Sequence, residues 1–206
     1  MKKTKARILD TALKLFNNNG LSKVTLRTIA KEMGISQGNL NYHFKKRASI
    51  IEVLYFQLVA NIDKSMSENQ SAEVGLQSLF NLSKTIMDNF YDYRFFLLDF
   101  VQIMRENKVI KAHYLQLSAL RQTQFRTLFD ILIKKGILRR EKLPNEYLYL
   151  YNRFQILGDF WISSAEVVNK RMTKKVVATY SEILNQAIFP YLTKEGEKAY
   201  FSLLRS

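Results

Sequence analysis

The chain has 206 residues, 47% of them hydrophobic, and is therefore long enough to bury a core in one large or two small domains. Its 32 Lys and Arg against 18 Asp and Glu give a net charge of +14, which suits a polyanionic partner such as nucleic acid or an anionic membrane surface. The absence of cysteine excludes disulfides, thiolate metal sites and cysteine nucleophiles, and is compatible with a reducing cytoplasm, where we expect the protein.

The N-terminal residues predict a helix over 4–18 that is kept in the folded protein. Its start is similar to a signal peptide, but Asp10 and Lys14 interrupt the apolar positions and no small-residue cleavage site follows. The first 50 residues hold 11 Lys and Arg against only Asp10 and Glu32, so the basic excess is concentrated here. The basic residues at the start of the helix could contact phosphates or form a solvated end. No run in the chain approaches the roughly 18 uninterrupted apolar residues of a membrane span, and we expect a soluble protein.

The stretch TLRTIAKEMGISQGNLNYHF, residues 25–44, has the pattern of two short helices joined by a glycine turn. Thr25 can cap the first helix. Apolar residues recur on it at i, i+3, i+4 and i+7, namely Leu26, Ile29, Ala30 and Met33. Gly34 can adopt the left-handed conformation that ends a helix, and Ser36 can cap the next one. The pattern predicts a helix-turn-helix.

The second of these helices presents a polar outer side. Leu40 and Phe44 are four residues apart and point inward together, so the opposite side carries Gly38 and Tyr42 with amide side chains beside them. Asn and Gln can pair with adenine in the major groove, Gly38 allows close approach of the backbone, and Tyr42 and His43 can donate to phosphates. An ordinary exposed helix turn also carries amides. We favour DNA binding, because cap, glycine and apolar spacing must all coincide to produce this motif.

The rest of the chain predicts helices only, and the fold class is all-α: an N-terminal three-helix helix-turn-helix domain, residues 1–47, and a larger C-terminal helical domain, residues 48–206. A fourth helix follows Arg47 and runs to about Met66. The polar stretch SENQSAEVG, residues 67–75, is long enough to be a connector. The further helices are predicted at 74–90, 92–105, 108–135, 145–167, 174–189 and 194–204.

Residues 8–50 carry ILDTALKLF, NNNGLSKVTLRTIAKEMGIS and GNLNYHFKKRASII in that order, and resemble the DNA-binding region of the TetR family of bacterial transcriptional regulators. The resemblance implies a two-domain homodimer in which three N-terminal helices bind double-stranded operator DNA. It implies that the larger domain dimerises and senses a small-molecule effector, which we expect to be apolar or aromatic. A repressor is expected from the family tendency alone.

The resemblance also implies DNA contacts from the start of the second helix, the recognition helix and the start of the fourth helix. Asn41 stands where the family usually has a phosphate-binding tyrosine, so either Tyr42 takes over that contact or Asn41 reads a base edge. Arg47 replaces a common lysine and keeps the charge needed for a phosphate. The expected DNA-binding residues are Thr25, Arg27, Thr28, Ser36, Gln37, Gly38, Asn39, Asn41, Tyr42, His43, Lys46 and Arg47.

The C-terminal domain is rich in aromatic residues between positions 80 and 161, which could line a cavity for an apolar or planar ligand or form plain core. His113 and Gln124 share an otherwise apolar face of the helix at 108–135. His113 is either a satisfied core or interface histidine or a polar group of a pocket. The expected ligand-binding residues are His113, Tyr114, Gln124 and Trp161.

The helices at 145–167 and 174–189 carry apolar residues on more than one face, which indicates burial on two sides or cover of a large monomer core. The resemblance implies that they pair with their two-fold mates in a four-helix, isologous interface. The expected interface residues are Tyr151, Phe154, Gly158, Ile162, Tyr180, Ile183, Leu184 and Ala187.

Three other classes of protein compete with this interpretation of the sequence. The first class is an enzyme, but the chain has no P-loop, GxSxG or HExxH motif and only two histidines. We therefore expect that the protein is not an enzyme and has no catalytic residue, bound metal or cofactor. A basic protein bound to a membrane would explain the charge but not the capped turn at Gly34, and we expect no membrane partner. A helix-turn-helix protein without a small effector is the main alternative, and a cavity in the C-terminal domain would separate it from the first interpretation.

Overall fold

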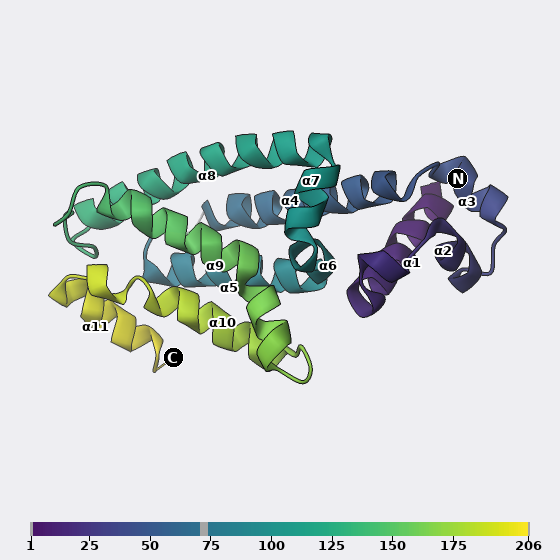
Figure 1. The fold of residues 1–206 in the computed structure, drawn as a ribbon. Helices are drawn as coiled ribbons and strands as arrows, with labels where there is room; N and C mark the ends of the chain where they lie inside the picture. Colours follow the sequence, from purple (N-terminus) through teal and green to yellow (C-terminus); the bar gives the residue numbers. More distant parts are fainter. Residues whose placement is uncertain (1, 71–73, 206) are drawn as a thin grey trace.

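The computed structural model describes residues 2–70 and 74–205, which form an all-α fold (Figure 1). The predicted fold class is confirmed. Within the described ranges the chain forms no β-strand, apart from an isolated bridge between Leu138 and Leu192, and no helix that is long and apolar enough to cross a membrane. The helices are α1 (Lys2–Asn19), α2 (Leu26–Glu32), α3 (Gln37–His43), α4 (Arg47–Gln70), α5 (Leu76–Asp92), α6 (Arg94–Leu98), α7 (Phe100–Glu106), α8 (Lys108–Lys134), α9 (Glu146–Val168), α10 (Lys174–Gln186) and α11 (Lys194–Leu203), with the 3₁₀ helices η1 (Leu21–Lys23) and η2 (Phe189–Tyr191).

Helices α1 to α3 pack together at one end of the molecule, to the right in Figure 1. Gly34 has a φ of 66°, in the left-handed region that favours glycine, and ends α2. The amide of Ile35 then donates to the carbonyl of Ala30 at 3.0 Å, which closes the turn. The buried side chains of this small core include Ile8, Ala12, Phe16, Ile29 and Leu40. The helix-turn-helix therefore forms where the local signals predict it.

Helix caps fix both helices of the motif. The hydroxyl of Thr25 accepts from the amide of Thr28 at 3.2 Å, and the hydroxyl of Thr28 accepts from the amide of Thr25 at 2.9 Å. This is a reciprocal capping box in which threonine takes the place of the usual Glu or Gln. The hydroxyl of Ser36 accepts from the amide of Asn39 at 3.1 Å and begins α3.

The larger body is built around α4, which leaves the N-terminal helices and runs between α8 and α5 (Figure 1). Helix α5 packs against α4 and α10, and α9 packs against α6 and α8. One apolar cluster continues from α1 through α4 to α6 and α9, and includes Phe16, Leu54, Phe95 and Ile162. A second cluster fills the far end, beside α11. The N-terminal helices therefore share their core with the near end of the body.

Three predicted elements differ in detail. The helix expected at 92–105 is two helices, α6 and α7, which meet at Asp99. Phe95, Phe96 and Leu97 are consecutive and all buried, and a straight helix with one inner face could not bury all three. Helix α10 ends at Gln186 instead of 189, and Pro190 lies in η2. Helix α4 continues to Gln70, and residues 71–73 of the expected connector lie outside the described residues.

Candidate DNA-binding surface and effector cavity

The outer side of α3 is polar and carries no acidic residue. Leu40 and Phe44 are buried, and the exposed fraction of Tyr42 is 71%, so the ring and the neighbouring amides project into solvent. His43 and Arg47 are half-buried. The other residues expected at DNA are all exposed: Thr25, Arg27, Thr28, Ser36, Gln37, Gly38, Asn39, Asn41, Tyr42 and Lys46.

Gly38 lies in the first turn of α3, and the fold itself does not require a glycine there. A Cβ atom at this position would meet only the hydroxyl of Ser36, at 3.9 Å. Its φ is not in the left-handed region, whereas the φ of Gly34 is. The missing side chain at Gly38 therefore leaves room on the outside of the protein, where a duplex would approach.

Arg47 has a role inside the protein that the sequence did not indicate. Its Nη1 donates to the carbonyl of Leu21 at 2.6 Å and to that of Val24 at 3.1 Å. These carbonyls belong to η1 and to the residue after it, just before α2. The guanidinium thus fastens the start of α4 to the segment that leads into the helix-turn-helix.

A second junction joins α1 to α6. The side chain of Asn17 donates through Nδ2 to the carbonyl of Asp92 at 2.7 Å, and its Oδ1 accepts from the amide of Phe95 at 3.0 Å. The rings of Phe16 and Phe95 lie beside this contact with their centroids 5.2 Å apart. The next two residues of α6, Phe96 and Leu97, line the cavity described below. One short helix therefore contacts both α1 and the cavity.

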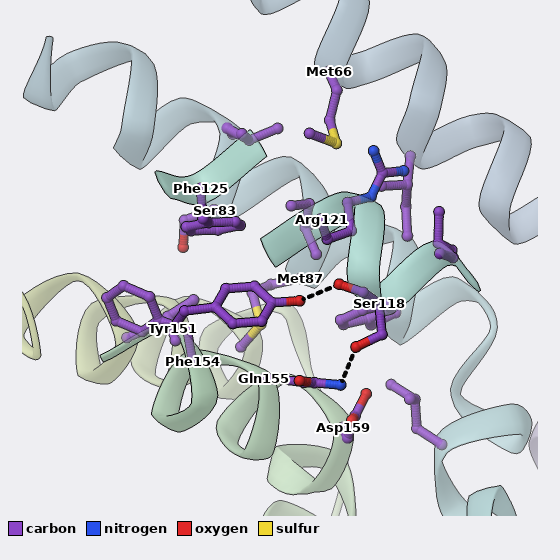
Figure 2. A pocket seen from close by; sticks show the side chains of 18 of the residues that line it. Met66, Ser83, Met87, Ser118, Arg121, Phe125, Tyr151, Phe154, Gln155 and Asp159 are labelled. Atoms are coloured by element: carbon purple, nitrogen blue, oxygen red, sulfur yellow. Dashed lines mark hydrogen bonds between the residues drawn. The ribbon is translucent and has the colours of Figure 1, made fainter. Parts of the chain in front are cut away.

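The larger body contains a cavity of about 210 Å³ between α4, α5, α6, α8, α9 and α10. Its wall is mainly aliphatic and aromatic, as is usual for sites that bind small molecules. Figure 2 shows Tyr151 and Phe154 from α9, Phe125 from α8 and Met66 and Met87 from α4 and α5 around this space. The larger body is therefore not solidly packed between these helices.

Polar groups gather at one side of the cavity, between α8 and α9. Tyr114 donates its hydroxyl to Oδ2 of Asp159 at 2.5 Å. Gln155 donates through Nε2 to the hydroxyl oxygens of Tyr114, at 3.0 Å, and Ser118, at 2.9 Å. The hydroxyl of Tyr151 donates to the carbonyl of Ser118 at 3.0 Å (Figure 2). Burial raises the pKa of Asp159 from 3.8 to about 6, although the hydrogen bond from Tyr114 opposes this rise.

Two further polar side chains of the wall differ in how they are paired. The hydroxyl of Ser83, on α5, is buried and has no hydrogen-bond partner among the described residues. An unpaired buried hydroxyl costs roughly 1–3 kcal/mol, and a bound polar atom would remove that cost. Arg121, by contrast, forms an ion pair through Nη2 with Asp63 of α4 and donates through Nη1 to Gln124 at 2.8 Å.

Of the four residues expected to bind a ligand, Tyr114 lines this cavity and the other three do not. His113 is half-buried, and its Nδ1 lies 2.9 Å from the hydroxyl of Tyr55 on α4. This is the satisfied interface histidine that the sequence left open. Gln124 accepts from Arg121, and Trp161 is buried with its ring 5.4 Å from that of Tyr180. Helical periodicity shows that these residues face inward, but it does not show where packing leaves a space.

The sequence did contain a signal for the polar groups of the cavity. Tyr151, Gln155 and Asp159 recur every four residues along the inner face of α9. Tyr114 and Ser118 have the same spacing on α8. Polar residues in register on two inner faces would have indicated a polar pocket more reliably than the single histidine did.

Several residues expected at a dimer interface face the interior of their own chain. Tyr151, Phe154, Gly158 and Leu184 line the cavity, and Ile162 is fully buried. A Cβ atom at Gly158 would meet the ring of Phe90 in the same chain, at 3.7 Å. The others are half-buried or exposed: Tyr180, Ile183 and Ala187.

Helix α9 has a second apolar face that points away from the core. Four of its exposed apolar residues recur at i, i+7, i+11 and i+18 and therefore form a stripe along the helix, composed of Tyr149, Ile156, Phe160 and Val167. We call these four residues the α9 outer stripe. The apolar residues of α9 surround the helix, so periodicity alone could not distinguish this face from the inner one.

Comparison with known proteins connects both parts of the chain to one family. Residues 8–54 match the profile of bacterial regulatory proteins of the tetR family, and residues 57–200 match a profile described as bacterial transcriptional repressor. The transcriptional regulator YerO of Bacillus subtilis is 25% identical over 144 residues, which cover 68% of this chain and 50% of YerO. The match thus spans half the length of that relative.

Solved structures share the fold over nearly the whole chain. A TetR-family regulator from Marinobacter aquaeolei VT8 has a TM-score of 0.81 at 21% identity, covering 97% of this chain and 96% of that one. A transcriptional regulator from Saccharomonospora viridis in complex with choline has a TM-score of 0.75 at 19% identity, covering 94% and 100%. Because the second profile alone covers more than half of the chain and the first covers its helix-turn-helix, the chain belongs to the TetR family of bacterial transcriptional regulators.

Proposed function

We propose that this protein is a homodimeric repressor that binds a pseudo-palindromic operator through α3 and changes its DNA affinity when a small molecule occupies the cavity. The observation that carries this proposal is the connection between the two parts. An exposed, acid-free recognition helix is joined through α4 and α6 to the wall of a cavity. A DNA-binding protein without an effector would not need a space of about 210 Å³ at the end of that connection.

The DNA contacts are assigned by side-chain chemistry. Gln37, Asn39 and Asn41 present amides that can read base edges in the major groove. Tyr42 and Lys46 can bind phosphates on either side. Two such surfaces in a dimer would occupy successive major grooves, roughly 34–36 Å apart or somewhat more.

The α9 outer stripe supports the dimer. An exposed apolar face along a long helix is unfavourable in water and is typical of a surface that another protein covers. Ile183 on the neighbouring α10 is also an exposed apolar residue, at 46%. A two-fold arrangement would place the stripe against its own copy in an isologous contact.

The coupling runs through two helices. Tyr55 and Leu58 of α4 line the cavity, while Arg47 at the start of α4 holds the segment before α2. Phe96 of α6 lines the cavity, while the preceding residue contacts α1. A ligand that fits only one position of these helices shifts the population between two spacings of the recognition helices. Choline in the Saccharomonospora viridis neighbour supports a small molecule as the ligand.

The proposal can be tested without knowing the operator or the effector. DNA that the full chain selects from a random pool serves as the probe, and compounds are screened for those that both raise Tm and change DNA affinity. A cavity-filling substitution, Gly158→Leu, should abolish the effect of every such compound while leaving DNA binding intact. Compounds that bind the protein without changing its DNA affinity would contradict the proposal.

A further inference from the structure

Asp159 is the acidic residue of the cavity wall, and no basic side chain of the described residues forms an ion pair with it. Its Oδ2 accepts from Tyr114, and none of the ion pairs formed by the described residues includes it. A buried carboxylate in such surroundings is less stable as an anion than it is in water, in agreement with its raised pKa. A cation brought by a ligand would stabilise the charged form.

Arg121 is the basic residue of the wall, but its charge is already paired. Its guanidinium forms an ion pair with Asp63 on α4 and donates to Gln124 on its own helix. The side chain of Asp63 is 52% exposed, so this pair lies toward the outside of the cavity. The uncompensated charge of the wall is therefore negative, which disfavours an anionic ligand.

The remaining wall suits the apolar body of a cationic ligand. Aromatic rings attract cations through their faces and exclude water from a nearby ion pair. Eight aromatic side chains line the cavity: Tyr55, Phe80, Phe90, Phe96, Tyr114, Phe125, Tyr151 and Phe154. The volume of about 210 Å³ exceeds the roughly 150 Å³ of a cavity that holds benzene. One ring with a short chain therefore fits.

We propose that the effector is a compact apolar amine whose protonated nitrogen pairs with the carboxylate of Asp159. This inference rests on the proposed function of the cavity as the effector site. The ring or branched body of the amine lies among the aromatic side chains between α5, α8 and α9. Gln155 holds Tyr114, which in turn fixes the carboxylate. In Figure 2, Ser83 lies apart from Asp159, so its unpaired hydroxyl is available to a polar group at the other end of a ligand.

The experiment compares three probes that share one body and differ in the head group: phenylbutylamine, phenylbutanol and phenylbutyric acid. Calorimetric titration of the full-length protein at neutral pH measures each affinity. We expect the amine to bind at least about tenfold more tightly than the alcohol, because close charge pairs withdrawn from water are worth that much or more. The acid should bind most weakly.

The variant Asp159→Asn tests the residue itself. It keeps the shape of the side chain and an acceptor for the hydroxyl of Tyr114 but removes the charge. The affinity of the amine should therefore fall to that of the alcohol, while the affinity of the alcohol stays unchanged. The matched control is Asp130→Asn, since Asp130 is exposed on α8 and does not line the cavity. Circular dichroism and Tm show that each variant is folded.

Two results would overturn the inference. In the first, the alcohol or the acid binds the wild-type protein as tightly as the amine, or the preference for the amine survives in Asp159→Asn. In the second, none of the three probes binds at millimolar concentration. Either result leaves the effector role of the cavity standing, because that role fails only if ligands of the cavity do not change DNA affinity.

Discussion

The ring of Phe16 in α1 packs against the ring of Phe95 in α6, with the centroids 5.2 Å apart and the planes inclined by 36°. Phe16 is part of the core beneath the helix-turn-helix, and the residue after Phe95 lines the cavity. A change in the shape of the cavity can therefore shift α6 and, through the packed rings of Phe95 and Phe16, also α1. The hydrogen bonds of Asn17 close the same junction from the side.

The first prediction concerns Asn17. Replacing it by Ala removes one hydrogen bond to the last residue of α5 and one to Phe95 of α6, and should lower the free energy of unfolding by roughly 1–3 kcal/mol. Ligands should still bind in the cavity with unchanged affinity, but their effect on DNA affinity should shrink several-fold. Fluorescence anisotropy with selected DNA measures this effect.

The control for this variant is Asn19→Ala, because Asn19 is exposed near the same helix end and the hydrogen bonds of the junction come from Asn17. The control should respond to ligand as the wild type does. An Asn17→Ala protein with a full ligand response would show that the coupling bypasses this junction and runs through α4 alone.

The second prediction concerns Gly38. Because a Cβ atom fits at this position, Gly38→Ala should leave the protein as stable as before or raise its stability by up to about 1 kcal/mol. The added methyl group faces the duplex and should weaken operator binding. Urea unfolding and a gel shift at fixed salt separate the two effects.

Gly34→Ala is the complementary variant. The φ of 66° at Gly34 is strained for alanine, so this change should destabilise the fold by about 1 kcal/mol or more. If Gly38→Ala bound DNA with wild-type affinity, the backbone of α3 would not approach the duplex closely.

The third prediction concerns the α9 outer stripe. Ile156→Glu places a charge in the middle of the stripe and should weaken dimerisation by about 2 kcal/mol or more. Light scattering across a concentration series measures the shift toward monomer. Ile156 is 60% exposed, and Leu115 of α8 is 59% exposed, so Leu115→Glu is a matched control that should remain dimeric. If Leu115→Glu became monomeric and Ile156→Glu remained dimeric, the dimer interface would lie on α8 and not on α9.

The fourth prediction concerns pH. Burial raises the pKa of Asp159 from 3.8 to about 6, so its folded state binds a proton more readily than the unfolded state. The stability from this group is present below about pH 3.8 and is lost as pH rises through about 6. Asp159→Asn should therefore raise the free energy of unfolding at neutral pH, by roughly 1–3 kcal/mol after allowance for partial solvation.

Glu146 should show the opposite dependence. Hydrogen bonds from Arg139 and from the amide of Lys142 lower the pKa of Glu146 from 4.5 to about 2. Its stabilisation is present above pH 4.5 and is lost as pH falls toward 2. Urea unfolding of Glu146→Gln should show reduced stability at neutral pH and a weaker loss in the acidic range. If the free energy of unfolding depended on pH in the same way for Asp159→Asn and Glu146→Gln, the raised pKa of Asp159 and the lowered pKa of Glu146 would both be refuted.

The helix-turn-helix could be predicted from sequence because its signals are local. Thr25, Gly34 and Ser36 act on the turn in which they stand, whatever packs against them. The break at Asp99 depends on the helices that surround α6, and three consecutive apolar residues do not reveal it. The sequence predicts the cap of α2 at Thr25, but it does not reveal the reciprocal hydrogen bond from the amide of Thr25 to the hydroxyl of Thr28.

The cavity residues and the dimer-interface residues are harder to predict from sequence than the helix-turn-helix, for one shared reason. Helical spacing identifies the faces of α8 and α9, but which face meets the core depends on the neighbouring helices. His113 and Trp161 do face inward, yet other side chains fill the space around them. The sequence does not single out Asp159, because a single carboxylate in an apolar helix is usually solvated, and only its position opposite Tyr114 makes it part of a pocket.

The central claim is that α3 of a dimer reads operator DNA. The most direct test is selection of DNA from a random pool by the full chain at fixed salt, repeated with Tyr42→Ala and Asn41→Ala. We expect an inverted repeat with half-sites about one helical turn apart, bound more weakly by Tyr42→Ala and with altered base preference by Asn41→Ala. Absence of any enriched sequence, or identical sequences and affinities for all three proteins, would contradict the claim.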